Sequence, residues 1–163
     1  MLSDLQQKTV WEGWLASEIR AYYFADLGYR YQQRQRHATW VVLALSSGAL
    51  ATLLSDWLPP QWRWIRAALA ALTAGVSLWS LVAQNDKAAI ECADLHFRWN
   101  KLAGEYRALW DNMYAPSASK RLDDLFERSA ELSKSGVRMR NDTALMNKWQ
   151  DYVVRQHAAE IAA

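Results

Sequence analysis

The sequence is poor in residues that break helices or cross-link a chain. It has three prolines, six glycines and one cysteine among 163 residues. A lone cysteine, Cys92, cannot form an intrachain disulfide, so no disulfide framework holds this fold. No segment alternates apolar and polar residues as a half-buried strand does, and there is neither an internal repeat nor a low-complexity stretch. These absences leave an all-α fold as the prediction.

Charged residues are missing from two stretches in the middle of the chain. None occurs in 39–54 or in 67–83, although charges are dense on either side. A helix that crosses a bilayer needs about 20 mostly apolar residues, and the segments 38–58 and 64–83 have that length. A core helix of a water-soluble protein normally carries charge at every turn or so. We therefore predict an integral membrane two-helix hairpin, with a soluble bundle that contains an unusually apolar hairpin as the alternative.

Five of the ten tryptophans flank these two segments. Trp40 and Trp79 mark one end of the hairpin, and Trp57, Trp62 and Trp64 mark the other. Indole combines a large apolar body with one N–H donor, so it favours the interface level of a bilayer. Two belts of this kind are what a two-pass hairpin predicts.

Lysine and arginine set the expected orientation of the hairpin. Six of them lie close to its open end: Arg30, Arg34, Arg36, Lys87, Arg98 and Lys101. The turn that contains Pro59 and Pro60 carries only Arg63 and Arg66. The positive-inside rule then places both termini in the cytoplasm. Segment 1–37 has no early apolar run, so we expect the first span, not a cleaved signal peptide, to act as the insertion signal.

A heptad pattern follows the second span, which is expected to continue into it as one helix. The apolar residues step by four and three: Ala88, Cys92, Leu95, Trp99, Leu102, Tyr106, Leu109 and Met113. We call the last six of these the cytoplasmic seam. Such a seam implies a partner helix. The N-terminal segment 2–36, which lacks proline, is expected to run as a helix into the first span and to pair antiparallel with the seam. The same helix of a second subunit is the other possible partner.

The C-terminal part is expected to form two further helices. Pro116 ends the seam helix, and Ser117 or Ser119 can cap a helix that ends near Gly136. Its apolar face is expected to comprise Leu122, Leu125, Phe126, Ser129 and Leu132. Asp142 or Thr143 can cap the last helix, whose apolar side would comprise Leu145, Trp149, Tyr152 and Val153. We divide the chain into a two-span domain, 1–114, and a C-terminal cytoplasmic helical region, 115–163.

The sequence lacks the motifs of common enzymes. Its three histidines stand in no Glu-x-x-His pattern, and there is no Gly-rich phosphate loop, no Gly-x-Ser-x-Gly and no cysteine pair for zinc. Glu18 and Glu105 would approach each other if the long helices pair, but salt bridges with Arg20 or Arg107 are the expected outcome. We predict no catalytic site, metal or cofactor. With a net charge of +2 and one basic–aromatic cluster, "YRYQQRQRH", beside a span, we expect no direct nucleic-acid binding.

Two faces of the spans carry the most information about assembly. Small residues recur every fourth position, and these candidate helix-packing residues are Ala44, Gly48, Thr52, Ala67, Ala71 and Gly75. Small faces let helices approach closely in lipid, which predicts a homo-oligomer. A polar stripe on the second span comprises Thr73, Ser77, Ser80 and Gln84. Either these side chains bond to carbonyls of their own helix, or several copies line a water-filled path.

The arrangement of "YRYQQRQRH", two spans and "FRWNKLAGEYRALW" resembles the SLATT family, two-span effector modules of bacterial conflict systems. The resemblance covers about 11–114 and includes a W-x-x-L-x-x-E-Y-x-x-L pattern, met by Trp99, Leu102, Glu105, Tyr106 and Leu109. It implies a pore that disrupts the inner membrane during phage infection. It also implies a separate trigger, such as a sensor, a nucleotide signal from a nucleotide-synthesising enzyme, or a reverse transcriptase.

The leading hypothesis is therefore a self-assembling inner-membrane effector that forms a pore or perturbs the membrane. The alternative is a membrane-anchored scaffold or adaptor, whose cytoplasmic coiled coil recruits a partner.

Overall fold

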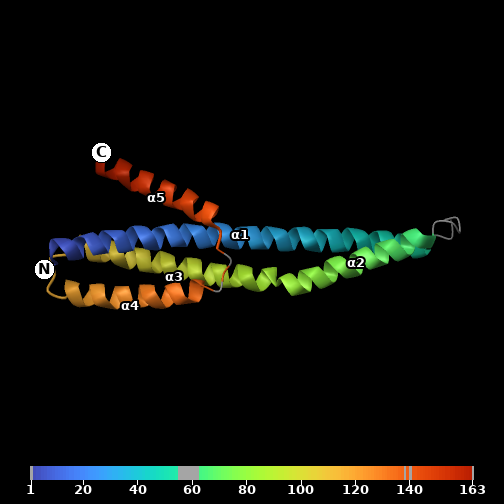
Figure 1. The fold of residues 1–163 in the computed structure, drawn as a ribbon, viewed down its shortest axis with the longest axis horizontal. Coiled ribbons are helices and arrows are strands. Elements are labelled where there is room, and N and C mark those ends of the chain that lie inside the picture. Colours follow the sequence, from blue (N-terminus) through green and yellow to red (C-terminus); the bar gives the residue numbers. More distant parts are fainter. Residues whose placement is uncertain (1, 55–62, 138, 140, 163) are drawn as a thin grey trace. The chain divides into compact units, whose positions relative to one another are not determined.

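The computed structural model describes residues 2–54, 63–137, 139 and 141–162, with the backbone alone at 48–54, 63, 65–67, 69, 70, 80–83 and 160–162. Over this part of the chain there are five α-helices and no strand (Figure 1). The helices are α1 (Asp4–Leu54), α2 (Arg63–Ala83), α3 (Asn85–Asp111), α4 (Ala118–Gly136) and α5 (Thr143–Ala162). The all-α prediction is confirmed.

The chain divides into two compact units, which we describe separately. Unit 1 comprises Met1–Gly28 and Ile90–Ala163, and unit 2 comprises Tyr29–Ala89. The first part of α1, most of α3, and all of α4 and α5 thus belong together. The boundary drawn from the sequence near residue 114 does not coincide with this division, because α4 and α5 pack against α1 and α3.

In unit 1, α1 and α3 pair antiparallel along their lengths. Leu2 N donates a hydrogen bond to Met113 O (3.2 Å), and His96 Nδ1 lies 2.9 Å from Ala21 O. Residue numbers therefore rise along α1 as they fall along α3. The core between them contains the seam: Leu95, Trp99, Leu102, Tyr106 and Leu109 are buried, and Met113 is half-buried. A heptad seam pairs in this way because its apolar side chains keep to one side of the helix.

The helix α4 completes this core along α3. Leu122, Leu125 and Leu132 are buried, whereas Phe126, expected on the same face, is exposed. Ser117 occupies the N-cap position, but its side chain makes no capping hydrogen bond. Beyond α4, Asp142 Oδ1 accepts a hydrogen bond from Leu145 N (3.0 Å) at the start of α5, as an N-cap side chain does.

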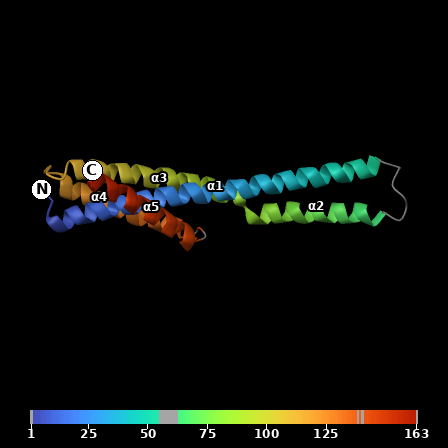
Figure 2. The same cartoon turned by 90° about the horizontal axis from the view of Figure 1, so that it is seen from above.

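The helix α5 packs across the first part of α1. The rings of Tyr22 and Trp149 stack with centroids 5.0 Å apart, and the indole N–H of Trp149 donates to Asp26 Oδ2 (3.2 Å). Of its expected apolar side, Leu145 and Val153 are buried, Trp149 is half-buried and Tyr152 is exposed. Figures 1 and 2 show α3 beside the first part of α1, with α5 running at an angle to α1.

Unit 2 is a helical hairpin in which α2 runs beside the second part of α1 (Figure 2). Half-buried residues on α1 include Val42 and Leu45, and those on α2 include Thr73, Val76 and Ser77. The expected spans, 38–58 and 64–83, fall partly outside the described residues. A search of the described residues finds no helix that is long and apolar enough to cross a lipid bilayer.

The second expected span does not continue without a break into the seam helix. Gln84 separates α2 from α3 with φ 45°, a left-handed conformation that costs a non-glycine residue about 1–2 kcal/mol. The new helix begins at Asn85, and Asp86 lies in its first turn, where a negative charge complements the helix dipole. Gln84 O accepts a hydrogen bond from Ala88 N (3.0 Å), which closes that first turn. The prediction of one continuous helix was wrong at this residue.

Candidate functional site

The polar stripe on α2 lies partly toward the neighbouring helix. Thr73 and Ser77 are half-buried within unit 2, and Thr73 already takes part in an interaction in the chain. Gln84 is exposed and ends the helix, while the side chain of Ser80 lies outside the described residues. Within one chain, Thr73 and Ser77 thus lie on a side of α2 that is partly covered.

The small face of α2 lies on the opposite, open side. Ala71 and Gly75 are exposed, and a Cβ added at Gly75 would meet no atom within 4 Å. Ala44 on α1 is also exposed. The side chains of Thr52 and Ala67, and the surroundings of Gly48, lie outside the described residues. The small residues that can be placed are therefore not used to pack α1 against α2 within one chain.

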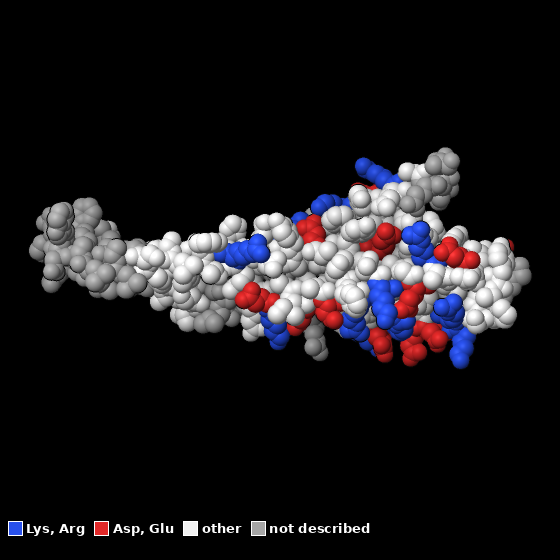
Figure 3. All heavy atoms as spheres, turned by 180° about the vertical axis from the view of Figure 1, so that it is seen from behind, with Lys and Arg blue, Asp and Glu red and all other residues white. Residues whose placement is uncertain are grey.

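Large apolar side chains also point outward from unit 2. Trp40 is 70% exposed and Leu78 is 63% exposed, and Leu43, Leu72 and Trp79 are exposed as well. In Figure 3 the charged side chains gather over the helices of unit 1, while most of the described hairpin surface is uncharged. The hairpin thus presents its apolar residues outward on both helices.

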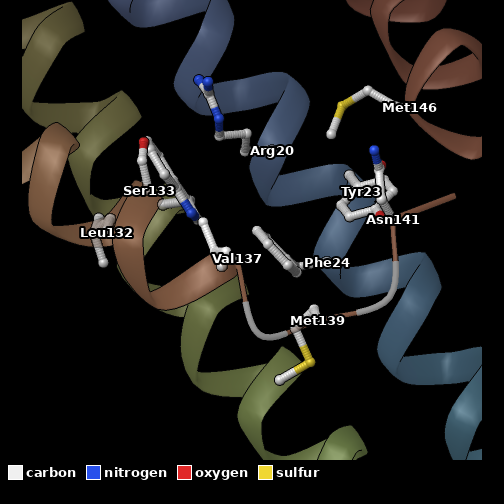
Figure 4. A pocket seen from close by; sticks show the side chains of 11 residues that line it. Arg20, Tyr23, Phe24, Leu132, Ser133, Val137, Met139, Asn141 and Met146 are labelled. Carbon is white, nitrogen blue, oxygen red and sulfur yellow. The ribbon is translucent and has the colours of Figure 1, made fainter. Parts of the chain in front are cut away.

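Unit 1 contains a pocket of about 400 Å³ between α1, α3, α4 and the connection that follows α4. Figure 4 shows Arg20, Tyr23 and Phe24 contributed by α1, with Leu132 and Ser133 contributed by α4. Trp99 of α3 lines the pocket as well. Aromatic and aliphatic side chains make up most of the wall, and Arg20 supplies a positive charge.

The charged group of this pocket, the Arg20 guanidinium, lies against an aromatic ring. The Arg20 guanidinium lies over the Trp99 ring, with Cζ 4.9 Å from the ring centroid, and its Nη1 donates to Ala16 O (3.2 Å). Burial lowers the pKa of Arg20, while the nearby Tyr106 opposes that shift. Among the described residues no carboxylate pairs with this guanidinium. Nothing in the sequence around Arg20 had marked it as a binding residue.

The two glutamates considered from the sequence do not meet, nor do they pair with Arg20 or Arg107. Glu105 instead accepts two hydrogen bonds from the guanidinium of Arg128 on α4. Hydrogen bonding to Glu105 raises the pKa of Arg128. Glu18 Oε2 lies 2.7 Å from Nε2 of the buried His157. The expected ion pair between Asp94 and Arg98 is present at 3.6 Å.

His157 lies in an aromatic cluster between α1 and α5. Its ring is edge-on to Trp14 at 4.8 Å and to Trp11 at 5.4 Å, and Trp11 also contacts Trp110 of α3. These contacts join three helices around one polar pair, which makes His157 a packing residue of the bundle. No group of three histidine, cysteine or acidic side chains is gathered for a metal within the described part of the chain.

The fold and site define an all-helical chain with a four-helix unit and an apolar hairpin. Comparison with family models, with curated proteins and with solved structures found no match.

Proposed function

We propose that this chain is a self-assembling membrane protein, whose hairpin lies in a bacterial inner membrane and perturbs it or forms a pore there. The observation that carries the proposal is the outward exposure of large apolar side chains on both helices of unit 2, Trp40 and Leu78 among them. Exposed apolar surface that recurs along both helices calls for lipid or another subunit to cover it. The sequence stretches 39–54 and 67–83 contain no charged residue, which fits a hairpin in lipid.

Self-assembly is supported by the open small face on α2. A Cβ at Gly75 would meet no atom within 4 Å, so no described residue covers this face there, and a helix of another copy can approach it closely. Small-residue faces associate in lipid through backbone proximity, where apolar burial offers no driving force. We infer that copies of the chain meet through Ala71 and Gly75.

The resemblance to SLATT modules gives this proposal its biological setting. A membrane effector in anti-phage defence would require a separate trigger, such as a sensor protein, a nucleotide signal or a reverse transcriptase partner. The proposed membrane topology keeps both termini, and therefore unit 1, in the cytoplasm, where such a trigger would act.

The assembly is tested with Gly75→Leu in the full-length chain. We expect fewer oligomers in detergent micelles, because one clash at a close helix contact offsets an interaction of roughly 1 kcal/mol and shifts the equilibrium several-fold. The matched control is Ala74→Leu, an exposed neighbour of Gly75 on a different face, which should keep the wild-type size distribution. Equal distributions for both variants would show that the small face is not the interface.

A second function, a membrane-anchored scaffold, is favoured by the half-burial of Thr73 and Ser77. If α1 covers these hydroxyls in every copy, they line no water path, and the hairpin serves as an anchor for unit 1. Ion flux from liposomes that contain the oligomeric protein separates the two functions. Flux above that of empty liposomes supports the effector, whereas its absence in protein that inserts and oligomerises supports the scaffold.

A further inference from the structure

The pocket of unit 1 has an excess of hydrogen-bond donors. Arg20 carries five N–H donors, and among the described residues its hydrogen bond is the one to Ala16 O. The indole Nε1 of Trp99 is buried and has no hydrogen-bond partner among the described residues. Both residues line the same cavity. Two donor groups thus belong to the lining of one cavity, and no described residue of that lining is acidic.

Burying N–H donors without an acceptor raises the free energy of the folded state. Trp99 is 1% exposed, and buried polar groups almost always have a partner. A half-buried guanidinium without a carboxylate loses hydration that the Trp99 ring only partly replaces. Two exposed arginines of the unit pair with carboxylates, Arg128 with Glu105 and Arg98 with Asp94. The absence of a carboxylate beside the half-buried Arg20 therefore indicates an anionic ligand.

The walls indicate what the rest of the ligand is made of. Tyr23 and Phe24 are buried residues of α1, and their rings line the cavity beside Leu132 of α4. A volume of about 400 Å³ lies within the range of small-molecule sites, which combine apolar walls with a few placed polar groups. Ser133 adds one hydroxyl to the polar side.

We propose that this pocket binds a small organic anion, with a phosphate or carboxylate held by Arg20 and the Trp99 N–H, and an aromatic or apolar body against Phe24 and Tyr23. Guanidinium donors match both kinds of anion in a two-point geometry, and charge-assisted hydrogen bonds are the stronger ones. All of these residues belong to unit 1, so the proposal stands whether or not the hairpin acts in a membrane.

The test is calorimetric titration of the full-length chain in detergent micelles with phenyl phosphate and, separately, with benzoate. We expect saturable binding of at least one of them, and the tighter one identifies the preferred anion. Inorganic phosphate should bind more weakly, because it leaves the apolar walls empty. Equal affinity for inorganic phosphate and phenyl phosphate would contradict the aromatic part of the proposal.

Three variants separate a binding role from a structural one. Arg20→Met keeps an unbranched helix-forming side chain and removes the charge, so affinity should fall about tenfold or more. Trp99→Phe keeps a ring under Arg20 and removes the N–H, so affinity should fall about threefold to tenfold. The matched control is Arg107→Met, which removes another arginine that lies over a tryptophan, at 5.7 Å from the Trp14 ring, and does not line this pocket.

Unchanged affinity in Arg107→Met together with the loss in Arg20→Met supports the proposal. An equal loss in both variants indicates non-specific charge attraction and overturns it. Absence of saturable binding to wild-type protein overturns it as well, and leaves a water molecule as the partner of Trp99. Circular dichroism checks that each variant keeps its helices, because Trp99 is also part of the core. The anion should raise the midpoint of thermal unfolding for wild-type protein but not for Arg20→Met.

Discussion

A close contact between α1 and α3 in unit 1 predicts that Gly13→Ala destabilises the fold, although alanine is the better helix former. A Cβ at residue 13 would lie 2.6 Å from Cε1 and 2.7 Å from Cζ of Tyr106. Carbon atoms pack at about 3.5–4.0 Å, so the ring would have to move by about 1 Å. Tyr106 is buried in the seam and has little room to do so. Overpacking of this kind costs about 1–3 kcal/mol.

A second glycine separates the steric cost from the backbone gain. Gly104 lies inside α3 of the same unit, and a Cβ there would meet no atom within 4 Å. Each substitution gains about 1 kcal/mol of helix propensity, so the difference between the two variants reports the clash alone. We expect Gly104→Ala to stabilise the chain by about 1 kcal/mol and Gly13→Ala to be less stable than Gly104→Ala by about 1–3 kcal/mol.

The measurement is thermal unfolding of the full-length chain in detergent micelles, followed by far-UV circular dichroism. A difference of about 2 kcal/mol corresponds to about 4–8 °C between the two midpoints for a chain of this size. In a Tyr106→Leu background the penalty at residue 13 should shrink, because the clashing ring atoms are gone. Equal midpoints for Gly13→Ala and Gly104→Ala would refute the close approach of α1 and α3 at this position.

Three further predictions concern a thiol, a cap and the polar stripe. Burial, with a smaller effect of Glu91, raises the pKa of Cys92 from its usual 9.0 to about 11. The folded chain therefore keeps a proton that the unfolded chain loses above pH 9, and the free energy of unfolding should fall by about 2–3 kcal/mol as pH rises from 9 to 11. Cys92→Ala should lack this contribution in the same pH series, and a slope equal to that of wild-type protein would exclude it. Asp142→Ala should cost about 0.5–2 kcal/mol in urea unfolding. Ser117→Ala should cost less, since its side chain makes no capping bond, and a larger loss at residue 117 would reverse that assignment. If the stripe lines a path, Ser77→Leu should abolish liposome ion flux and Ser77→Asp should favour cations. Wild-type flux from oligomeric Ser77→Leu protein would remove this face from the pore.

Local sequence signals were sufficient to predict the helices and several of the positions where they begin or end. The heptad seam places Leu95, Trp99 and Leu102 on one side of α3, and all three are buried. Proline and capping residues act within a few positions of themselves, which is why the end of α3 before Pro116 and the cap at Asp142 could be predicted. The break at Gln84 was missed, since no proline or glycine marks it and a left-handed glutamine has no sequence signature.

The partners of individual side chains were decided only by the tertiary structure. Glu18 meets His157, and Glu105 meets Arg128, at separations along the chain that no local spacing rule covers. The same applies to Arg20. It is a candidate binding residue because no described carboxylate pairs with it and because it lies over Trp99, which belongs to another helix. Helical periodicity determines which residues turn toward the core, because it follows from 3.6 residues per turn. Which donor is left without an acceptor depends on how four helices pack around one cavity, and this packing is a property of the assembled unit.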